Sequence, residues 1–317
     1  MLNHDEAGTV RPLALAWVRR HLEVGERIVR TEALQGGITA EMRRLTIGTR
    51  DGGTRDLVLR TFVNVEHAED WLNREAGTLT LLTGASVPAP ELVAVDPTAV
   101  HCEHPSLLMT HLAGRTALGD EGLEARVPAL ARQLVAIHAL RPAERPREYE
   151  ALTTADTAIV PKGADAAAWT AAISVIRTPA PPYEGRCPHR DFHPGNVLFD
   201  VRLPTRAGAR ITGVVDWVRT SWGPADLDVA HCSTNLALLH GPEWGQRFAE
   251  AYEEAGGVLA VAAGERLFWQ ARDALALSEE VQLVAQAWRE AGRTELTTRA
   301  VENRLDAYVT ALMDARG

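Results

Sequence analysis

The stretch from Cys187 to Asp200, CPHRDFHPGNVLFD, holds the side chains of this sequence with the clearest capacity for chemistry. Asp191 is followed five positions later by Asn196, and an apolar run begins directly after it. A carboxylate can accept or orient a hydroxyl proton, and a carboxamide can bind magnesium through its oxygen. The pair therefore favours a loop that transfers a phosphoryl group.

A second acid is expected beside this pair. After a polar segment broken by proline and glycine, the chain continues into ITGVVDW, whose acid is Asp216. Strands 197–199 and 211–215 are therefore predicted to form a β-hairpin, which brings Asn196 and Asp216 together at its open end. Amide and carboxylate oxygens are ligands that Mg²⁺ accepts. The alternative is that Asp191 and its two partners are only turn and strand-end residues.

The segments HRDFHPGN and VVDW resemble the catalytic and metal-binding loops of the aminoglycoside phosphotransferase and small-molecule kinase superfamily, relatives of the protein kinases. The resemblance implies that Asp191 is the catalytic base and that Asn196 and Asp216 bind Mg²⁺. The sequence departs from the common pattern at Arg190, where glycine is frequent, and at Trp217, where protein kinases carry Phe-Gly. Neither position supplies the chemistry.

The resemblance also implies an α+β, bilobal protein-kinase-like fold, with a five-stranded antiparallel N-lobe, one main helix and a mostly helical C-lobe. We expect the N-lobe in residues 1–109, a hinge at 110–114, and a C-lobe with the catalytic loop and acceptor site in 115–317. The strand-like runs RIVRTEAL, AEMRRLTIG, TRDLVLRTF, ELVAVD and SLLMTH agree with this N-lobe. Further helices are predicted over residues 11–23, 66–82, 225–240, 243–256, 262–291 and 295–315.

Two short segments are candidates for nucleotide binding. Glycine at Gly36 and Gly37 lets backbone N–H groups approach phosphates, although a plain hairpin turn would use the same residues. Thr110, His111 and Leu112 fall where a kinase chain crosses between lobes. The resemblance implies that their backbone groups hold the edge of adenine or guanine, with ATP or GTP as the phosphoryl donor.

Arg60 ends the third predicted strand, where kinases place the lysine that contacts the α and β phosphates. Lys162 is the only lysine of the chain and lies in a loop segment, so Arg60 is the cation available at that position. Glu75 lies on the apolar face of the helix predicted over 66–82, and a buried carboxylate needs a facing cation. The alternatives are a surface Arg60 and a Glu75 paired with Arg74.

Other polar residues have structural explanations. His138 closes a helical run and is interpreted as a core histidine. Residues 101–104, HCEH, lack a second ligand cluster and are predicted to form a hairpin loop rather than a metal site. The resemblance implies that Asp226 holds the catalytic loop, although it can equally be a first-turn helix acid, and His193 is interpreted as structural support.

Composition limits the partners. The chain has 317 residues, of which 46% are hydrophobic, without an uninterrupted apolar run of membrane-spanning length or an export signal after Met1. Three scattered cysteines are typical of a reducing compartment. We therefore expect a cytoplasmic protein without a membrane partner, as a monomer or homodimer, and the net charge of −9 argues against nucleic acid.

The acceptor is expected to be a small hydroxylated molecule, because too few residues follow Asp216 for the activation segment with which protein kinases bind polypeptides. Residues 221–317 carry fifteen Asp and Glu against eight Arg, and an acidic surface would attract a cationic acceptor, although ordinary solvated helix faces give the same count. An aminoglycoside is favoured, which would make the chain an antibiotic-resistance kinase.

Three alternatives stay open at this point. A macrolide or another natural product is one acceptor class, and a metabolite of the choline, homoserine or sugar-amine type is another. A nucleotide-binding pseudokinase is the alternative from a different functional class. The complete set of Asp191, Asn196 and Asp216 argues against the pseudokinase.

Overall fold

The computed structural model describes residues 11–34, 40–200 and 209–315. The chain divides into two compact units, unit 1 with Met1–Ala85 and Ala89–Ala113, and unit 2 with Ser86–Pro88 and Gly114–Gly317. The boundary after Ala113 falls inside the predicted hinge. The short segment 86–88 joins unit 2, because the N–H of Val214 donates to the carbonyl oxygen of Pro88 at 2.8 Å. The sequence pattern did not indicate that residues 86–88 belong to unit 2.

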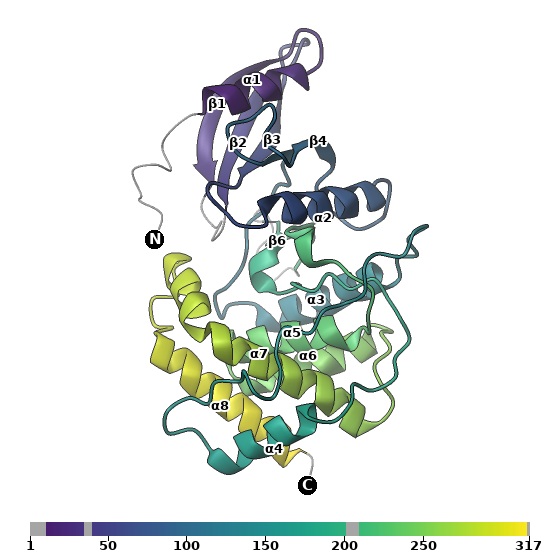
Figure 1. The fold of residues 1–317 in the computed structure, drawn as a ribbon, viewed down its shortest axis with the longest axis vertical. Helices are drawn as coiled ribbons and strands as arrows, with labels where there is room; N and C mark the ends of the chain where they lie inside the picture. The colour runs from purple at the N-terminus through teal and green to yellow at the C-terminus, as the bar shows by residue number, and fades with distance from the viewer. Residues whose placement is uncertain (1–10, 35–39, 201–208, 316–317) are drawn as a thin grey trace. The chain divides into compact units, whose positions relative to one another are not determined.

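Unit 1 is built on one five-stranded antiparallel sheet, in purple to blue in Figure 1, with the strand order β1-β2-β3-β5-β4. Its strands are β1 Arg27–Leu34, β2 Glu41–Gly48, β3 Thr54–Thr61, β4 Leu92–Asp96 and β5 Ser106–Thr110. The predicted strands match these bounds to within one residue at each end. The reason is that β-rich runs bounded by turn residues leave little freedom in where a strand ends.

Helix α1, Pro12–Arg20, packs on the sheet through an apolar core. Side chains alternate along a strand, so Leu57 and Leu59 of β3 point to the same face and pack with Trp17 in this core. Leu13 is apolar but does not join this core, since it is 58% exposed. The buried stripe of the short helix runs instead through the neighbouring positions Ala14, Leu15 and Val18.

Unit 2 combines a small hairpin with six α-helices among its described residues. The hairpin strands are β6 Val197–Phe199 and β7 Ile211–Val214. The helices are α3 Leu123–His138, α4 Ala166–Ile176, α5 Asp226–His240, α6 Pro242–Glu254, α7 Ala263–Glu290 and α8 Thr298–Asp314. The four predicted C-terminal helices are confirmed as α5 to α8, which pack beside one another in green to yellow in Figure 1.

Helix α5 is the centre of unit 2, since it packs against α6, α7 and α8. Every residue from Asp226 to Leu239 is buried. Burying a charged side chain is costly unless it is paired, so the charged residues of α5 must find partners inside the unit. These residues include Asp228 and His231, which contact the segment HRDFHPGN, residues 189–196, the predicted catalytic loop.

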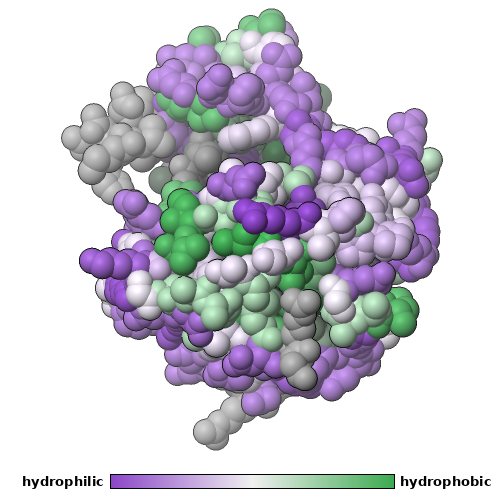
Figure 2. Space-filling model, turned by 60° about the horizontal axis from the view of Figure 1, so that its bottom comes forward, coloured by the Kyte–Doolittle hydropathy of each residue, from purple (hydrophilic) through white to green (hydrophobic). Residues whose placement is uncertain are grey.

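The surface is of mixed polarity. Figure 2 shows green patches of hydrophobic residues set among purple hydrophilic ones on one face of the molecule. Across the three described ranges, no helix combines the length and apolar character needed to cross a membrane.

Candidate active site

The predicted base and the predicted amide ligand are in direct contact. Asp191 lies just before a single 3₁₀ turn, Pro194–Asn196. The Nδ2 of Asn196 donates to the Oδ2 of Asp191 and to its backbone oxygen, both at 3.0 Å. With its nitrogen used in this way, the side chain of Asn196 keeps its Oδ1 for another partner.

The predicted hairpin is confirmed. Val197 of β6 pairs with Val214 of β7, and the N–H of Val215 donates to the carbonyl oxygen of Asn196 at 3.0 Å. Asp216 follows directly, with a φ of +67°, a left-handed conformation that aspartate tolerates better than most residues. Asn196 and Asp216 therefore lie at the same open end of the hairpin.

The turn between base and amide depends on a glycine. The Nδ1 of His193 accepts a hydrogen bond from the N–H of Gly195 at 3.1 Å. A Cβ at Gly195 would lie 2.7 Å from the imidazole ring, which is too close for any other residue. Burial lowers the pKa of His193 to about 4, although nearby Asp191 acts to raise it. A neutral His193 thus supports the turn, as interpreted from the sequence.

The loop is fixed from α5 by Asp228, which is fully buried. Its Oδ2 accepts the backbone N–H of His189 and its Oδ1 that of Arg190, both at 2.7 Å. The Nε2 of His138 lies 3.1 Å from Oδ2, and its Nδ1 lies 2.7 Å from the hydroxyl of Tyr252. Burial acts to raise the pKa of Asp228, but the hydrogen bond and charge of His138 hold it below its ordinary value. His138 is therefore a satisfied core histidine, as predicted.

Asp226 does not hold the catalytic loop, contrary to what the family resemblance implied. Its carboxylate accepts the N–H of Ala260, at 3.2 and 3.3 Å, and burial raises its pKa. It is a first-turn helix acid, which was the alternative interpretation. The segment GPADLDVAH contains two acids, Asp226 and Asp228, two positions apart. The rotation of α5 about its axis determines that Asp228, and not Asp226, faces the loop.

Two features explain the departures from the family pattern. Arg190 has a φ of +72°, in the left-handed region that glycine adopts most easily, which accounts for the frequent glycine at this position. The ring of Trp217 packs on that of His189 with centroids 4.3 Å apart. The Nδ1 of His189 accepts the N–H of Asp191 at 3.2 Å, and its Nε2 lies 3.1 Å from the oxygen of Val215, so it ties both segments together.

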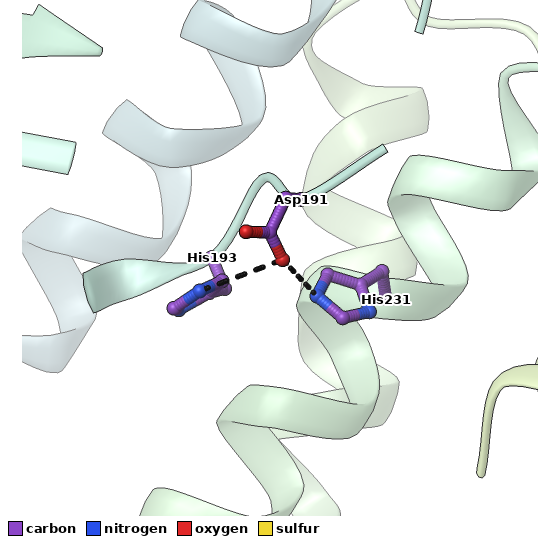
Figure 3. Close-up of side chains that lie close together, drawn as sticks. All are labelled: Asp191, His193 and His231. Atoms are coloured by element: carbon purple, nitrogen blue, oxygen red, sulfur yellow. Dashed lines mark ion pairs between the residues drawn. The ribbon is translucent and has the colours of Figure 1, made fainter. Parts of the chain in front are cut away.

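Two residues that the sequence analysis did not identify, His231 and Asp273, are linked to Asp191. Figure 3 shows the rings of His193 and His231 on two sides of Asp191, both directed at one carboxylate oxygen. The Nε2 of His231 lies 3.3 Å from this oxygen and that of His193 lies 3.8 Å from it. The Nδ1 of His231 lies 3.0 Å from the Oδ1 of Asp273 on α7. A sequence signal existed, because Asp273 interrupts the apolar stripe of α7 between Trp269 and Leu277.

The electrostatics of this group favour an ionised Asp191. Burial acts to raise the pKa of Asp191, but the hydrogen bond from His231 and the charge of its ring hold this pKa well below its ordinary value. Burial acts to lower the pKa of His231, but Asp273 and Asp191 raise it to about 10. About a quarter of the Asp191 side chain, 26%, is exposed, so this carboxylate can still meet a substrate.

The predicted ion pair of unit 1 is present. The Nη1 of Arg60 donates to both carboxylate oxygens of Glu75, at 3.0 and 2.8 Å. Both side chains are largely buried, with 10% and 3% exposed. The guanidinium also lies 5.0 Å from the ring centroid of Phe62. Arg74 pairs with Asp70 instead, so the alternative partner for Glu75 is excluded.

Of the three residues predicted to hold the nucleotide base, Thr110, His111 and Leu112, only the last keeps a backbone N–H without a backbone partner among the described residues. The N–H groups of Thr110 and His111 donate to carbonyl oxygens of unit 1 at 3.0 and 3.2 Å. Among the described residues, the N–H of Leu112 has no such partner. Gly36 and Gly37, the predicted phosphate-approaching pair, lie outside the described residues.

A hollow in unit 2 borders the catalytic loop. It is lined by aromatic, apolar and charged side chains, among them Tyr149, Leu152, Arg190, Trp269, Arg272 and Asp273. The rings of Tyr149 and Trp269 meet edge to face, with centroids 5.8 Å apart. Asp273 is 9% exposed, and its Oδ2 has no hydrogen-bond partner in the part of the chain that the structure describes.

A five-stranded sheet with its buried Arg–Glu pair, together with a helical unit that carries the HRDFHPGN loop, defines the class of protein-kinase-like phosphotransferases. Residues 31–268 match the model of the phosphotransferase enzyme family. The chain belongs to this family and is a small-molecule kinase. No curated protein sequence gives a significant match.

Solved structures of aminoglycoside phosphotransferases share the fold. The apo form of a thermostable mutant of APH(4)-Ia is 18% identical with a TM-score of 0.62, over 95% of this chain and 99% of that one. The GDP and kanamycin complex of an APH(2″) enzyme is 16% identical with a TM-score of 0.58, over 92% and 95%. The aminoglycoside-3′-phosphotransferase of type VIII is 23% identical with a TM-score of 0.55, over 82% and 97%.

Proposed function

We propose that this kinase transfers the γ-phosphoryl group of ATP or GTP, with Mg²⁺, to a hydroxyl of a small molecule. The observation that carries the proposal is the contact of Asn196 with Asp191 at 3.0 Å, at the hairpin end where Asp216 also lies. A carboxylate and an amide fixed together beside a second acid suit phosphoryl transfer, which depends on positioning and charge neutralisation.

Asn196 and Asp216 suit a magnesium ion. The nitrogen of the Asn196 amide is committed to Asp191, which leaves its oxygen as the donor that a hard cation accepts. Asp216 adds a carboxylate, and Mg²⁺ usually takes only one or two from a protein, completing its shell with water and phosphate oxygens. When bound, the ion would neutralise charge that develops on the phosphates.

Asp191 would receive the acceptor hydroxyl. As the hydroxyl oxygen forms its bond to the γ-phosphorus, the bond from that phosphorus to the bridging oxygen breaks, and its electron pair leaves with the nucleoside diphosphate. The hydroxyl proton passes to Asp191. Because the pKa of this carboxyl is held low, Asp191 is a weak base that orients the hydroxyl first and takes the proton late.

The nucleotide would be held by unit 1. Arg60, aligned by Glu75, supplies the cation for the α and β phosphates. The N–H of Leu112, for which the described part of the chain provides no backbone acceptor, suits the edge of the base better than those of Thr110 and His111, which already have partners. The glycine pair at 36–37 remains the proposed approach to the phosphates. The enzyme would act in the cytoplasm, as a monomer or homodimer.

For the acceptor we favour an aminoglycoside, and with it a role in antibiotic resistance. Similar folds were solved with kanamycin and with hygromycin B, and the C-terminal third of this chain is acidic. A macrolide or another bulky natural product is the second candidate. The hollow favours it, because Arg190 and Arg272 offset the acids and the partly exposed ring of Tyr149 offers an aromatic surface.

The test is a panel of aminoglycosides, macrolides and small metabolites, assayed for Mg²⁺-dependent release of ADP or GDP with identification of the phosphorylated product. One class of hydroxylated acceptor should stimulate turnover and gain one phosphate. Failure of every acceptor, with tight nucleotide binding and no turnover, would support the pseudokinase instead.

A further inference from the structure

Both ring nitrogens of His231 face carboxylates. Nδ1 lies 3.0 Å from the Oδ1 of Asp273, and Nε2 lies 3.3 Å from the Oδ1 of Asp191. An ionised carboxylate can only accept hydrogen bonds, so a ring that satisfies both neighbours must carry a proton on each nitrogen. The geometry therefore favours a charged imidazolium between two acids.

The surroundings reinforce this charge. His231 is buried, with a side chain 9% exposed, and its nearest charged groups are the two carboxylates. His193 lies across from it, with ring centroids 5.7 Å apart, and is neutral at pH 7 because burial lowers its pKa. On α8, burial raises the pKa of Tyr308 with a contribution from Asp273, so that phenol stays neutral as well.

A neutral ring is the competing arrangement. The Nδ2 of Asn235 lies 3.3 Å from the Nε2 of His231 and donates to the carbonyl oxygen of the same residue at 2.9 Å. A neutral ring could accept from this amide through Nε2. It would then turn the same lone pair toward the ionised Asp191, which is unfavourable in a buried site.

A metal ion is a second alternative, because Asp191, His193 and His231 offer ligand atoms within 4.8 Å of one another. The hydrogen bonds argue against it. The Nδ1 of His193 accepts the N–H of Gly195, so the proton of its neutral ring is on Nε2, the atom that faces Asp191. A metal would need a lone pair there and another on His231.

We propose that His231 is a positioning residue, an imidazolium anchored on Asp273 that holds the carboxylate of Asp191 in place. The inference rests on the proposed function of Asp191. Asn196 holds one oxygen of that carboxylate and His231 the other, so the group cannot rotate away from the acceptor. Through Asp273, which also lines the hollow, α7 sets the orientation of the base.

The test compares His231→Gln with His240→Gln. Both histidines lie on α5 and face a carboxylate, but His240 pairs with Asp120 and does not touch the catalytic loop. In His231→Gln we expect kcat to fall roughly 10- to 100-fold with the nucleotide KM within about twofold of wild type. His240→Gln should keep the wild-type kcat. Asp273→Asn, which retains an acceptor for Nδ1 but removes the charge, should lower kcat less than His231→Gln.

Nitrogen-15 NMR of the histidine rings in the wild-type protein gives a readout that does not depend on activity. Two protonated ring nitrogens on His231 at pH 8 are the expected result. A neutral ring at pH 8, or a wild-type kcat in folded His231→Gln while Asp191→Asn is inactive, would overturn the inference. An active Asp191→Asn would instead refute the proposed function, and the ring signals would then decide the charge of His231 alone.

Discussion

The carboxylate of Asp228 accepts the backbone N–H of Arg190 at 2.7 Å, and so fixes from α5 the residue directly before the proposed base. Arg190 has a positive φ, which costs free energy in any residue but glycine. The buried hydrogen bond offsets this cost. The conformation of the catalytic loop thus depends on a residue 38 positions away in the chain.

Asp228→Asn should destabilise the fold. An asparagine presents its NH₂ group to one of the two buried backbone N–H groups, which leaves a donor unsatisfied. The expected loss in the free energy of unfolding is about 1–3 kcal/mol, measured by urea denaturation. Asp226→Asn is the control, because burial already raises the pKa of Asp226 and an amide oxygen can still accept from Ala260. Equal losses in both variants would contradict the role of Asp228.

Arg60→Met should impair both stability and nucleotide binding. The substitution removes the cation that pairs with the buried carboxylate of Glu75, at an expected cost of about 3 kcal/mol in the free energy of unfolding. The same cation is the one proposed to contact the nucleotide phosphates. Arg60→Lys keeps a cation without the forked geometry, so the nucleotide KM should lie between wild type and Arg60→Met. Thermal unfolding and steady-state kinetics measure the two effects. A wild-type nucleotide KM in Arg60→Met would show that this arginine is only structural.

Asp216→Asn should change the requirement for metal. An amide is a weaker magnesium ligand than a carboxylate, so the Mg²⁺ concentration for half-maximal turnover should rise, roughly tenfold or more. Asp314→Asn, at the exposed end of α8, controls for loss of one negative charge. The same Mg²⁺ dependence in both variants would remove Asp216 from the metal site.

Stability against pH should distinguish two histidines of α5. The pKa of His231 is raised to about 10, above its ordinary value, so its stabilisation is complete below about pH 6.5 and is lost as the pH rises toward 10. The pKa of His240 is lowered to about 4 by burial, so its contribution is lost as the pH falls from about 6.5 to 4.

The measurement is the free energy of unfolding of wild type minus that of each His→Gln variant, across this pH range. For His231→Gln the difference should shrink above pH 6.5, and for His240→Gln it should shrink below pH 6.5. Parallel curves for the two variants would contradict the assigned charge states.

The sequence predicted local structure better than long-range contacts. The strands and the hairpin that begins after Asn196 follow from β-rich runs bounded by turn residues. The Arg60–Glu75 pair follows from the need of a buried carboxylate for a cation. Asp228 rather than Asp226 binds the backbone of the loop because of the rotation of α5 within unit 2, which a single sequence does not specify. His231 and Asp273 were missed because they meet only when α5 packs on α7.

The central claim is that Asp191 receives the acceptor hydroxyl, and Asp191→Asn tests it most directly, since the amide keeps the size of the side chain. Phosphoryl transfer to an acceptor identified in the panel should be measured alongside nucleotide affinity in the same preparation. We predict that transfer falls by at least about 100-fold while the variant remains folded and its nucleotide affinity stays close to wild type. Transfer at the wild-type rate in this variant would contradict the account.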